Sequence, residues 1–286
     1  MAKNFNTITM DTTLTNADKL LVGQNDGDDV GTIVGEVKRF ISSPLEDNFK
    51  NGLMIPMYIY PTDAYTNTDY NSVITYKRQN RNVPVVVIIN PSNGPGAVTD
   101  GNYTMAIDRM KAVGIHVIGY VSTAYRANTT TDVKADIDGW KSYYPGIDGI
   151  FFDEQSDGTA DLGAEQAYYK EVAEYSRQQG FDITVSNPGV DVDNSWYDLF
   201  DILVEFESDT WPTSGNMDGA WPGGKQLFKR GGLKHSSTAG DLTSNDAAIF
   251  EEFLQHYGWV YVTTDILPNP WDSLSTELSD VYSAIG

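Results

Sequence analysis

The sequence contains no cysteine. Disulfides, a thiol nucleophile and a cysteine-ligated zinc site are therefore excluded, and cysteine usage says nothing about the redox compartment. Histidine is also scarce, and His116, His235 and His256 have no metal-ligand spacing. A site for Mg²⁺ or Ca²⁺ built from carboxylates alone stays open, although "DGDD" at 26–29 lacks the EF-hand loop pattern. We expect neither a metal nor a cofactor.

Long apolar runs are missing as well. No run approaches the roughly 18 residues that a membrane span needs, and residues 1–16 lack the apolar core of a signal peptide. We therefore expect no membrane partner and no secretory signal in this chain.

Positive charge is in short supply, since 19 Lys and Arg face 40 Asp and Glu, for a formal net charge of −21. Such a chain repels nucleic acid phosphates and anionic membranes and attracts cationic ligands, so nucleic acid is not an expected partner. Solubility alone is the simpler explanation of the charge.

Two common catalytic motifs are also absent. The glycine-rich "NPSNGPG" at 90–96 has no lysine for a phosphate, and no "GxSxG" elbow occurs.

Two regions differ in composition. Residues 1–50 are rich in Thr, Asn, Asp and Gly and lack a long helical stripe, which predicts a small N-terminal appendage. Residues 51–286 form the second domain. There, eight short apolar runs, mostly β-branched or aromatic, have the composition of strands covered on both faces. They are 53–60, 84–90, 115–121, 147–152, 182–186, 202–207, 233–236 and 259–263.

Helical patterns fill most gaps between these runs. Val133, Ile137, Trp140 and Tyr144 form one apolar stripe, a second pattern spans about 162–179, and a third spans 245–257 with Ser244 as its expected N-cap. Strands alternating with helices predict a (β/α)8 TIM barrel, with a doubly wound sheet as the alternative. The seventh strand and the segment before it, 210–232, carry the weakest signal.

The stretch "YPGIDGIFFDEQSDG" at 144–158 ends a buried strand on two acids, Asp153 and Glu154. An Asp that caps the next helix beside a solvated Glu would explain the pair taken alone. In a barrel, however, the strand C-termini carry the active site. Consecutive strand residues point to opposite faces, so both acids can face one pocket only if the strand breaks at Asp153.

A second acidic position lies in "DILVEFESD" at 201–209. Alternation along a strand puts Glu205 and Glu207 on one face, and an acid inside so apolar a strand is costly unless it is paired. Two carboxylates across a cleft suit glycoside hydrolysis, in which one protonates the leaving oxygen and the other attacks or activates water.

Polar and aromatic residues near the expected strand ends complete this predicted site. Aromatic rings there could stack on sugars, although each taken singly is more simply explained by packing. The aromatic candidates are Tyr58, Tyr60, Tyr120, Tyr125, Trp211, Trp221 and Trp271. The polar candidates for binding substrate are Asn90, Asn93, Asn187, Glu205, His235 and Asp265.

The motifs also carry a family resemblance. "IPMYIYP", "VIINPSNGPG", "VIGYVSTAY", "YPGIDGIFFDE", "TVSNPG", "FE" and "GWVYVTTD" occur in the order and spacing of the spherulin-4-like glycoside hydrolases, from about Gly52 to the C-terminus. The resemblance implies a TIM-barrel, endo-acting hydrolase of galactosamine or N-acetylgalactosamine polymers in exopolysaccharide. By motif position it implies that Asp153, Glu154 and Glu207 are the catalytic acids.

Residues 1–50 resemble the opening of bacteriophage tail-fibre and receptor-binding proteins, over a shorter and less specific match. That similarity implies a depolymerase carried on a virion tail, which reaches the cell exterior without an export signal. It also implies a homotrimer, with other virion tail proteins and the polysaccharide as partners. Two alternatives stay open: a polysaccharide-binding adhesin on the same barrel without catalysis, and a protein whose main task is to build the tail.

Overall fold

The computed structural model describes residues 51–285, apart from 64, 215–216 and 218–226. The predicted appendage at 1–50 and the aromatic candidate Trp221 lie outside the described residues.

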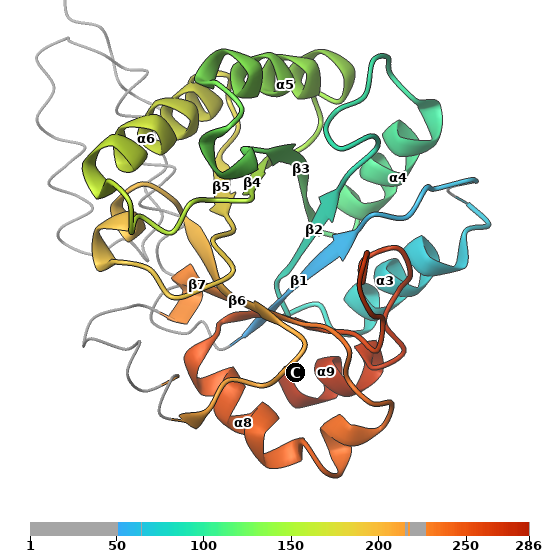
Figure 1. The fold of residues 1–286 in the computed structure, drawn as a ribbon. Helices are drawn as coiled ribbons and strands as arrows, with labels where there is room; N and C mark the ends of the chain where they lie inside the picture. The colour runs from blue at the N-terminus through green and yellow to red at the C-terminus, as the bar shows by residue number, and fades with distance from the viewer. Residues whose placement is uncertain (1–50, 64, 215–216, 218–226, 286) are drawn as a thin grey trace, which may run out of the picture. The chain divides into compact units, whose positions relative to one another are not determined.

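Eight parallel strands form a closed barrel (Figure 1). The last strand pairs with the first, Gly52 opposite Trp259 and Leu53 opposite Val260, so the sheet has no free edge. This closure confirms the predicted TIM barrel and excludes the doubly wound sheet. The strands are β1 (Gly52–Met57), β2 (Val85–Ile89), β3 (His116–Ser122), β4 (Gly149–Asp153), β5 (Ile183–Ser186), β6 (Ile202–Ser208), β7 (Arg230–Lys234) and β8 (Trp259–Val262).

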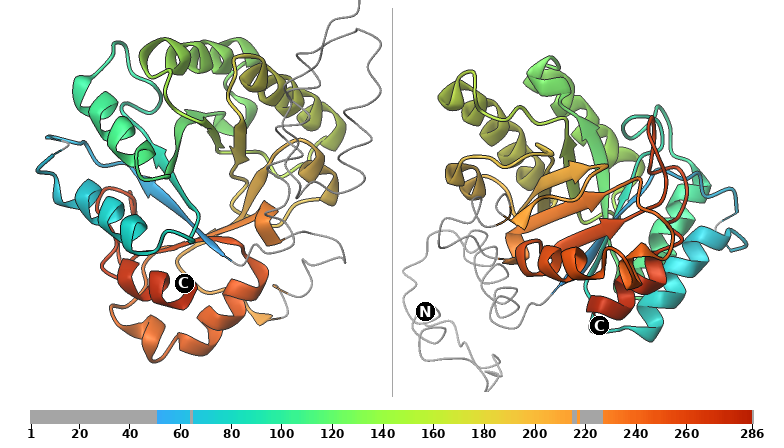
Figure 2. Two further views of the ribbon diagram at one scale, coloured as in Figure 1. Left: turned by 180° about the vertical axis from the view of Figure 1, so that it is seen from behind. Right: turned by 60° about the horizontal axis from the view of Figure 1, so that its bottom comes forward.

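Helices surround this barrel (Figure 2). The α-helices are α3 (Thr68–Gln79), α4 (Gly101–Lys111), α5 (Thr130–Tyr143), α6 (Leu162–Gln178), α8 (Ala247–His256) and α9 (Leu278–Ile285). Shorter 3₁₀ segments are η2 (Ala124–Arg126), η3 (Asn194–Asp198), η4 (Leu227–Lys229) and η5 (Asp241–Thr243). Within the described ranges, the structure contains no helix with the length and apolarity that a bilayer crossing requires.

The helix α5 shows how the sequence pattern produces this packing. Thr129 and Asp132 close a capping box at its N-terminus, and Val133, Ile137 and Trp140 are its buried residues, as the stripe predicts. The Trp140 indole lies where a Cβ on Gly119 of β3 would sit, only 2.5 Å away, so this strand position requires glycine. The indole N–H donates to the carbonyl of Tyr120 at 2.9 Å, which ties α5 to β3.

Several sequence predictions were wrong in their boundaries; the strand predicted at 53–60, for example, ends at Met57. The helix α8 begins after Asp246 instead of Ser244, because the Ser244 hydroxyl donates to the Gly240 carbonyl and belongs to the preceding turn. The strand β7 begins at Arg230, three residues before the predicted start, since Gly231 and Gly232 conceal the apolar pattern of a strand. A Cβ on Gly232 would lie 2.3 Å from the Phe253 ring, so these glycines let α8 approach the barrel closely.

Candidate active site

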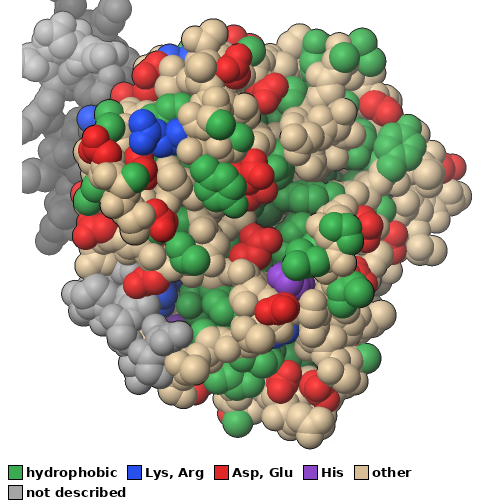
Figure 3. Space-filling model, viewed as in Figure 1, with side chains coloured by type: hydrophobic (Ala, Val, Ile, Leu, Met, Phe, Trp, Pro, Cys, Tyr) green, Lys and Arg blue, Asp and Glu red, His purple; other side chains and the backbone are tan. Residues whose placement is uncertain are grey.

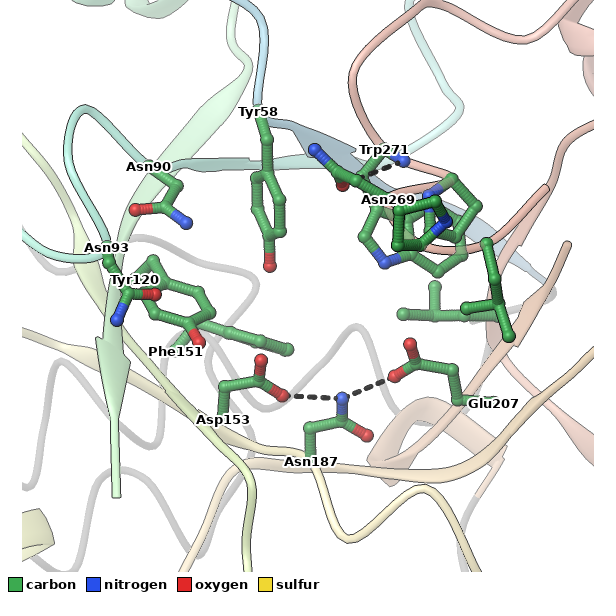
Figure 4. Close-up of a pocket in the computed structure, with 14 residues that line it drawn as sticks. Tyr58, Asn90, Asn93, Tyr120, Phe151, Asp153, Asn187, Glu207, Asn269 and Trp271 are labelled. Carbon is green, nitrogen blue, oxygen red and sulfur yellow. Dashed lines mark hydrogen bonds between the residues drawn. The ribbon is translucent and has the colours of Figure 1, made fainter. Parts of the chain in front are cut away.

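A cavity of about 360 Å³ opens at the C-terminal ends of the strands. The space-filling view shows acidic and hydrophobic side chains gathered around a hollow on the face seen in Figure 1 (Figure 3). The cavity is lined by Tyr58, Asn90, Asn93, Tyr120, Phe151, Asp153, Asn187, Glu207, Leu233, Leu267, Pro268, Asn269, Pro270 and Trp271. Asp153 and Glu207 face each other across its floor, with the Asn187 amide between them (Figure 4).

The strand that carries Asp153 ends at this residue, and Glu154 has the left-handed φ of +56°. The break that the sequence required at this position is therefore present. Glu154 nevertheless does not line the cavity. Its carboxylate accepts a hydrogen bond from the Ser122 hydroxyl at 2.5 Å, and its carbonyl accepts from the Tyr125 N–H at 2.8 Å. Glu154 is thus joined to the end of β3, directly beside Asp153.

Asp153 is held by three donors. The Asn187 amide donates to its Oδ1 at 2.8 Å, and the Glu154 N–H and the Tyr120 hydroxyl also donate to this carboxylate. Burial raises the pKa of Asp153, the three hydrogen bonds lower it, and the Glu154 charge raises it; burial has the largest effect. The acid is therefore harder to ionise than an exposed aspartate, but its ionised form is the one that its donors stabilise.

Glu207 lies near the end of β6 and has different surroundings. Burial, and secondly the negative charge of Asp153, raise the pKa of Glu207 to about 7. Hydrogen bonds from the side chains of Asn187, at 2.6 Å, and Trp271 lower this pKa but do not offset the two larger effects. Near neutral pH, Glu207 can therefore hold a proton, whereas three hydrogen-bond donors stabilise the ionised form of Asp153. A carboxyl group with a raised pKa beside one whose ionised form is stabilised by donors suits an acid and base pair.

The distance between the two acids follows from the amide that joins them. One nitrogen, Nδ2 of Asn187, lies 2.8 Å from an Asp153 oxygen and 2.6 Å from a Glu207 oxygen. These oxygens are no further apart than the two bonds laid end to end. The nearest oxygens of the pair therefore lie short of the ~6.5 Å at which inverting spacings begin, which favours retention.

The prediction that Glu205 shares the pocket side of β6 with Glu207 was wrong. The pairing of β6 with β7 shifts register between Val204 and Phe206, so a bulge at Glu205 interrupts the alternation. The Glu205 carboxylate instead accepts from the Arg230 guanidinium at 2.7 Å, and both side chains are fully buried. The guanidinium also donates to the His256 carbonyl. Glu205 therefore joins β6 to β7 and is not placed to touch a ligand in the cavity.

Four predicted substrate-binding residues, Asn90, Asn93, Tyr120 and Asn187, line the cavity. Two others, Tyr60 and Tyr125, do not line it but are exposed on the loops that follow β1 and β3. The charges of Glu154, Asp153 and Glu207 all contribute to a raised pKa of Tyr125, after the larger effect of burial, so this ring is close to the acids.

Three further candidates lie outside the cavity lining. The Trp211 indole donates to Asp246 at 2.6 Å and packs on Phe253. His235 is buried, meets the Trp271 ring edge to face, and has a pKa lowered by burial and by Lys234. Asp265 accepts a hydrogen bond from the Ser273 hydroxyl. Of these, His235 contacts a residue of the cavity wall, Trp271, whereas Trp211 packs on α8.

The sequence reasoning did not identify the loop after β8 as a wall of the cavity. Leu267, Pro268, Asn269 and Pro270 line it together with Trp271. Of these only Trp271 was among the aromatic candidates. Tyr58, another aromatic candidate, lies next to it, since its N–H donates to the Trp271 carbonyl at 3.0 Å, and its hydroxyl points toward the acids (Figure 4). The two prolines in "LPNPW" were a usable signal, because they limit the conformations of a long loop beside a barrel strand.

Comparisons with known proteins agree with this architecture. Residues 52–285 match the family described as "Spherulation-specific family 4". Spherulin-4 of Physarum polycephalum is 30% identical over 244 residues, which cover 82% of this chain and 69% of that protein. The crystal structure of Aspergillus clavatus Sph3 in complex with GalNAc superposes with a TM-score of 0.72 at 21% identity, covering 82% of this chain and 97% of that one. The last comparison shows a shared fold.

Proposed function

The chain belongs to spherulation-specific family 4, and from this premise we propose that its barrel is an endo-acting glycoside hydrolase with Asp153 as nucleophile and Glu207 as general acid and base. The observation that carries the proposal is the carboxyl pair itself. Both acids line one cavity, one amide holds their nearest oxygens closer together than inverting spacings, and burial and the charge of Asp153 raise the pKa of Glu207 to about 7. Glu154 is a supporting acid in this proposal, since it lies beside the pair without lining the cavity.

The reaction has two steps. In the first, an Asp153 oxygen attacks the anomeric carbon while the Glu207 carboxyl gives its proton to the glycosidic oxygen, so the bond to the leaving sugar breaks and a glycosyl ester forms. In the second, the Glu207 carboxylate takes a proton from water, whose oxygen attacks the anomeric carbon and releases Asp153.

The two roles of Glu207 follow from its neighbour. While Asp153 is ionised, its charge contributes to the raised pKa of Glu207 and favours the acid form. Once Asp153 is an ester it carries no charge, so this contribution disappears and the pKa of Glu207 falls. Glu207 can then lose its proton and act as the base.

For the substrate, we propose a polysaccharide that contains galactosamine or N-acetylgalactosamine. Two observations support this choice. The solved structure with the same fold, Aspergillus clavatus Sph3, is a complex with GalNAc. The cavity wall also combines aromatic rings with the amides of Asn90, Asn93 and Asn269, which is the mixture of stacking and hydrogen-bonding groups that sugars require.

The proposed setting is a virion tail, in which residues 1–50 attach the barrel and the enzyme degrades polysaccharide outside the cell. Only the resemblance of residues 1–50 to tail-fibre proteins supports this setting. The same resemblance is the support for a homotrimer and for tail-protein partners.

The test is incubation of the protein with galactosamine-containing exopolysaccharide and mass spectrometry of the soluble products. We expect oligosaccharides from the unmodified protein and a loss of about 10²–10⁴-fold in rate for Asp153→Asn and for Glu207→Gln. Glu251→Gln, which makes the same acid-to-amide change at an exposed position of α8, is the matched control and should keep the full rate.

Two results would reject this account. Equal release by the unmodified protein and both variants would remove Asp153 and Glu207 from the chemistry. Polymer binding without release by the unmodified protein would leave the adhesin as the function.

A further inference from the structure

The segment Asn187, Pro188 and Gly189, which follows β5, lies between the two strands that carry the acids. On one side it bonds to β4 and the residues after it. The Asn187 N–H donates to the Phe152 carbonyl at 2.9 Å, and the Gln155 N–H donates to the Asn187 carbonyl at 3.0 Å. These two main-chain bonds are made by residues on either side of Asp153 and Glu154, so they fix the position of Asn187 relative to Asp153.

On its other side the same segment bonds to β6. The Gly189 N–H donates to the Val204 carbonyl at 3.0 Å, and the Glu207 N–H donates to the Gly189 carbonyl at 3.1 Å. Gly189 adopts a φ of +67°, which an L residue rarely takes, and a Cβ there would lie 3.7 Å from that of Glu207. Four main-chain hydrogen bonds thus connect this short segment to both acid-bearing strands.

The Asn187 side chain also connects the two strands, because it bonds to both carboxylates. An amide nitrogen has two N–H donors, and here its two acceptors are Asp153 and Glu207. The amide is buried, and its Oδ1 accepts no hydrogen bond from the part of the chain that the structure describes. The two acids are therefore the hydrogen-bond partners that orient this amide. A sugar hydroxyl could reach neither N–H without displacing a carboxylate.

We propose that Asn187 is a positioning residue that acts through Asp153 and Glu207, and not the sugar-binding residue that its place at a strand end suggests. The main-chain bonds of its segment set the spacing of the two strands, and its amide holds the two nearest carboxyl oxygens close together, as a retaining pair requires. The inference rests on the proposed function for its catalytic consequence, but the amide bridge can be tested without substrate.

The bridge also has an electrostatic effect. Two carboxylates this close repel each other, and N–H donors that stabilise the charged form offset part of that repulsion. Asn187 lowers the pKa of both acids for this reason. Without the amide, both carboxyl groups should hold their protons to a higher pH, and nothing would keep them at one fixed distance.

The experiment uses Asn187→Ala and Asn187→Leu in the full chain. The leucine variant keeps nearly the volume of asparagine and lacks both donors, so it remains informative if the alanine variant folds poorly. Carbon-13 NMR of the labelled side-chain carboxyls follows the titration of Asp153 and Glu207 in the resting protein. We expect both titrations to move upward by about one pH unit. With polymer, we expect kcat to fall about 100-fold while KM changes less than about threefold.

Asn93→Gly is the matched control, because Asn93 also lines the cavity, has a φ of +51° that glycine accepts, and makes no hydrogen bond to either acid within the part of the chain that the structure describes. It should raise KM and leave both titrations in place. A rise in KM with unchanged kcat and unchanged titrations in the Asn187 variants would overturn the proposal and make Asn187 a sugar-binding residue. If no polymer is cleaved by the unmodified protein, the proposed function fails, while the titrations still decide whether the amide bridge exists.

Discussion

Asp153 and Glu207 receive hydrogen bonds from the same amide, yet their other contacts differ. Asp153 has two further donors, the Tyr120 hydroxyl and the Glu154 N–H, whereas Glu207 has the Trp271 side chain and the repulsion of its partner. Burial, and secondly the charge of Asp153, raise the pKa of Glu207 to about 7. In this account Asp153 supplies the carboxylate, because three donors stabilise its ionised form, and Glu207 supplies the proton.

These two pKa shifts predict a pH dependence. Glu207 must be protonated to act as the acid, so kcat/KM should fall as the pH rises through about 7. Asp153 must be ionised, so kcat/KM should also fall at acidic pH, beginning above the usual range of aspartate because burial raises this pKa. A pH profile of kcat/KM measures both limbs, and a rate that keeps rising from pH 7 to 9 would contradict the assigned acid.

Tyr125 gives a second prediction at this scale. Ala124, Tyr125 and Arg126 all have positive φ values, an arrangement that costs roughly 1–2 kcal/mol for each residue that is not glycine. Among the contacts that hold this turn are the hydrogen bond from the Tyr125 N–H to the Glu154 carbonyl and an ion pair at 3.5 Å between Arg126 and the buried Glu165. The turn leaves the Tyr125 ring 66% exposed beside the acids, where it could stack on a sugar.

We expect Tyr125→Ala to raise KM for the polymer about 3–10-fold, the loss of one stacking contact, with little change in kcat. Tyr125→Phe keeps the ring and is the control that should retain KM. Initial rates over a range of polymer concentrations separate the two constants. An unchanged KM in Tyr125→Ala would remove this residue from the binding surface.

At the scale of single elements, the strands were readable from sequence and the irregularities were not. The runs that became β1 to β6 and β8 are largely apolar because helices and barrel interior cover both faces, which is a property of composition, whereas the two glycines of β7 concealed its start. The bulge at Glu205 leaves no mark in composition, since it depends on how β6 pairs with β7. Asp153 and Glu207 could be identified as candidates because each follows or ends an apolar run. That Glu205 and Glu207 point to different sides of β6 could be seen only in the structure.

The ion pair between Glu205 and Arg230 predicts a stability effect without a catalytic one. Glu205→Gln leaves a fully buried guanidinium without its charge partner and should lower the free energy of unfolding by about 3–5 kcal/mol. Urea unfolding measures this change. The double variant Glu205→Leu with Arg230→Met removes both charges and should recover most of the loss.

Activity measurements below the unfolding transition supply the counter-test for Glu205. Because its carboxylate contacts Arg230 and does not line the cavity, KM and the pH profile of Glu205→Gln should match those of the unmodified protein. A higher KM with unchanged stability would return Glu205 to the substrate-binding residues.

At the scale of the whole molecule, the alternation of strands and helices predicted the barrel, and closure of β8 on β1 confirmed it. The walls of the cavity were less predictable. They come from loops after different strands, such as Asn93 after β2 and Asn269 after β8, and sequence spacing does not tell which loops bend inward. The net charge of −21 has two explanations, solubility and attraction of a partly deacetylated, cationic polymer, and the structure does not choose between them.

Removing residues 1–50 tests how the functions divide along the chain. The barrel begins with Asn51, whose amide donates to the carbonyls of Leu254 and Tyr257, so a chain that starts at Asn51 keeps this anchor. We expect the shortened protein to retain kcat/KM within about twofold, because the described cavity draws all its lining residues from 58 to 271. In the proposed virion setting it should no longer assemble on particles. Loss of cleavage would mean that residues 1–50 contribute to catalysis.

The central claim is that Asp153 and Glu207 form a retaining pair, and proton NMR of the anomeric signals during polymer cleavage tests it most directly. The account predicts that the new reducing ends first appear with the anomeric configuration of the bond that was cleaved, before mutarotation mixes the two forms. First products of the opposite configuration, or no new reducing ends at all, would contradict it.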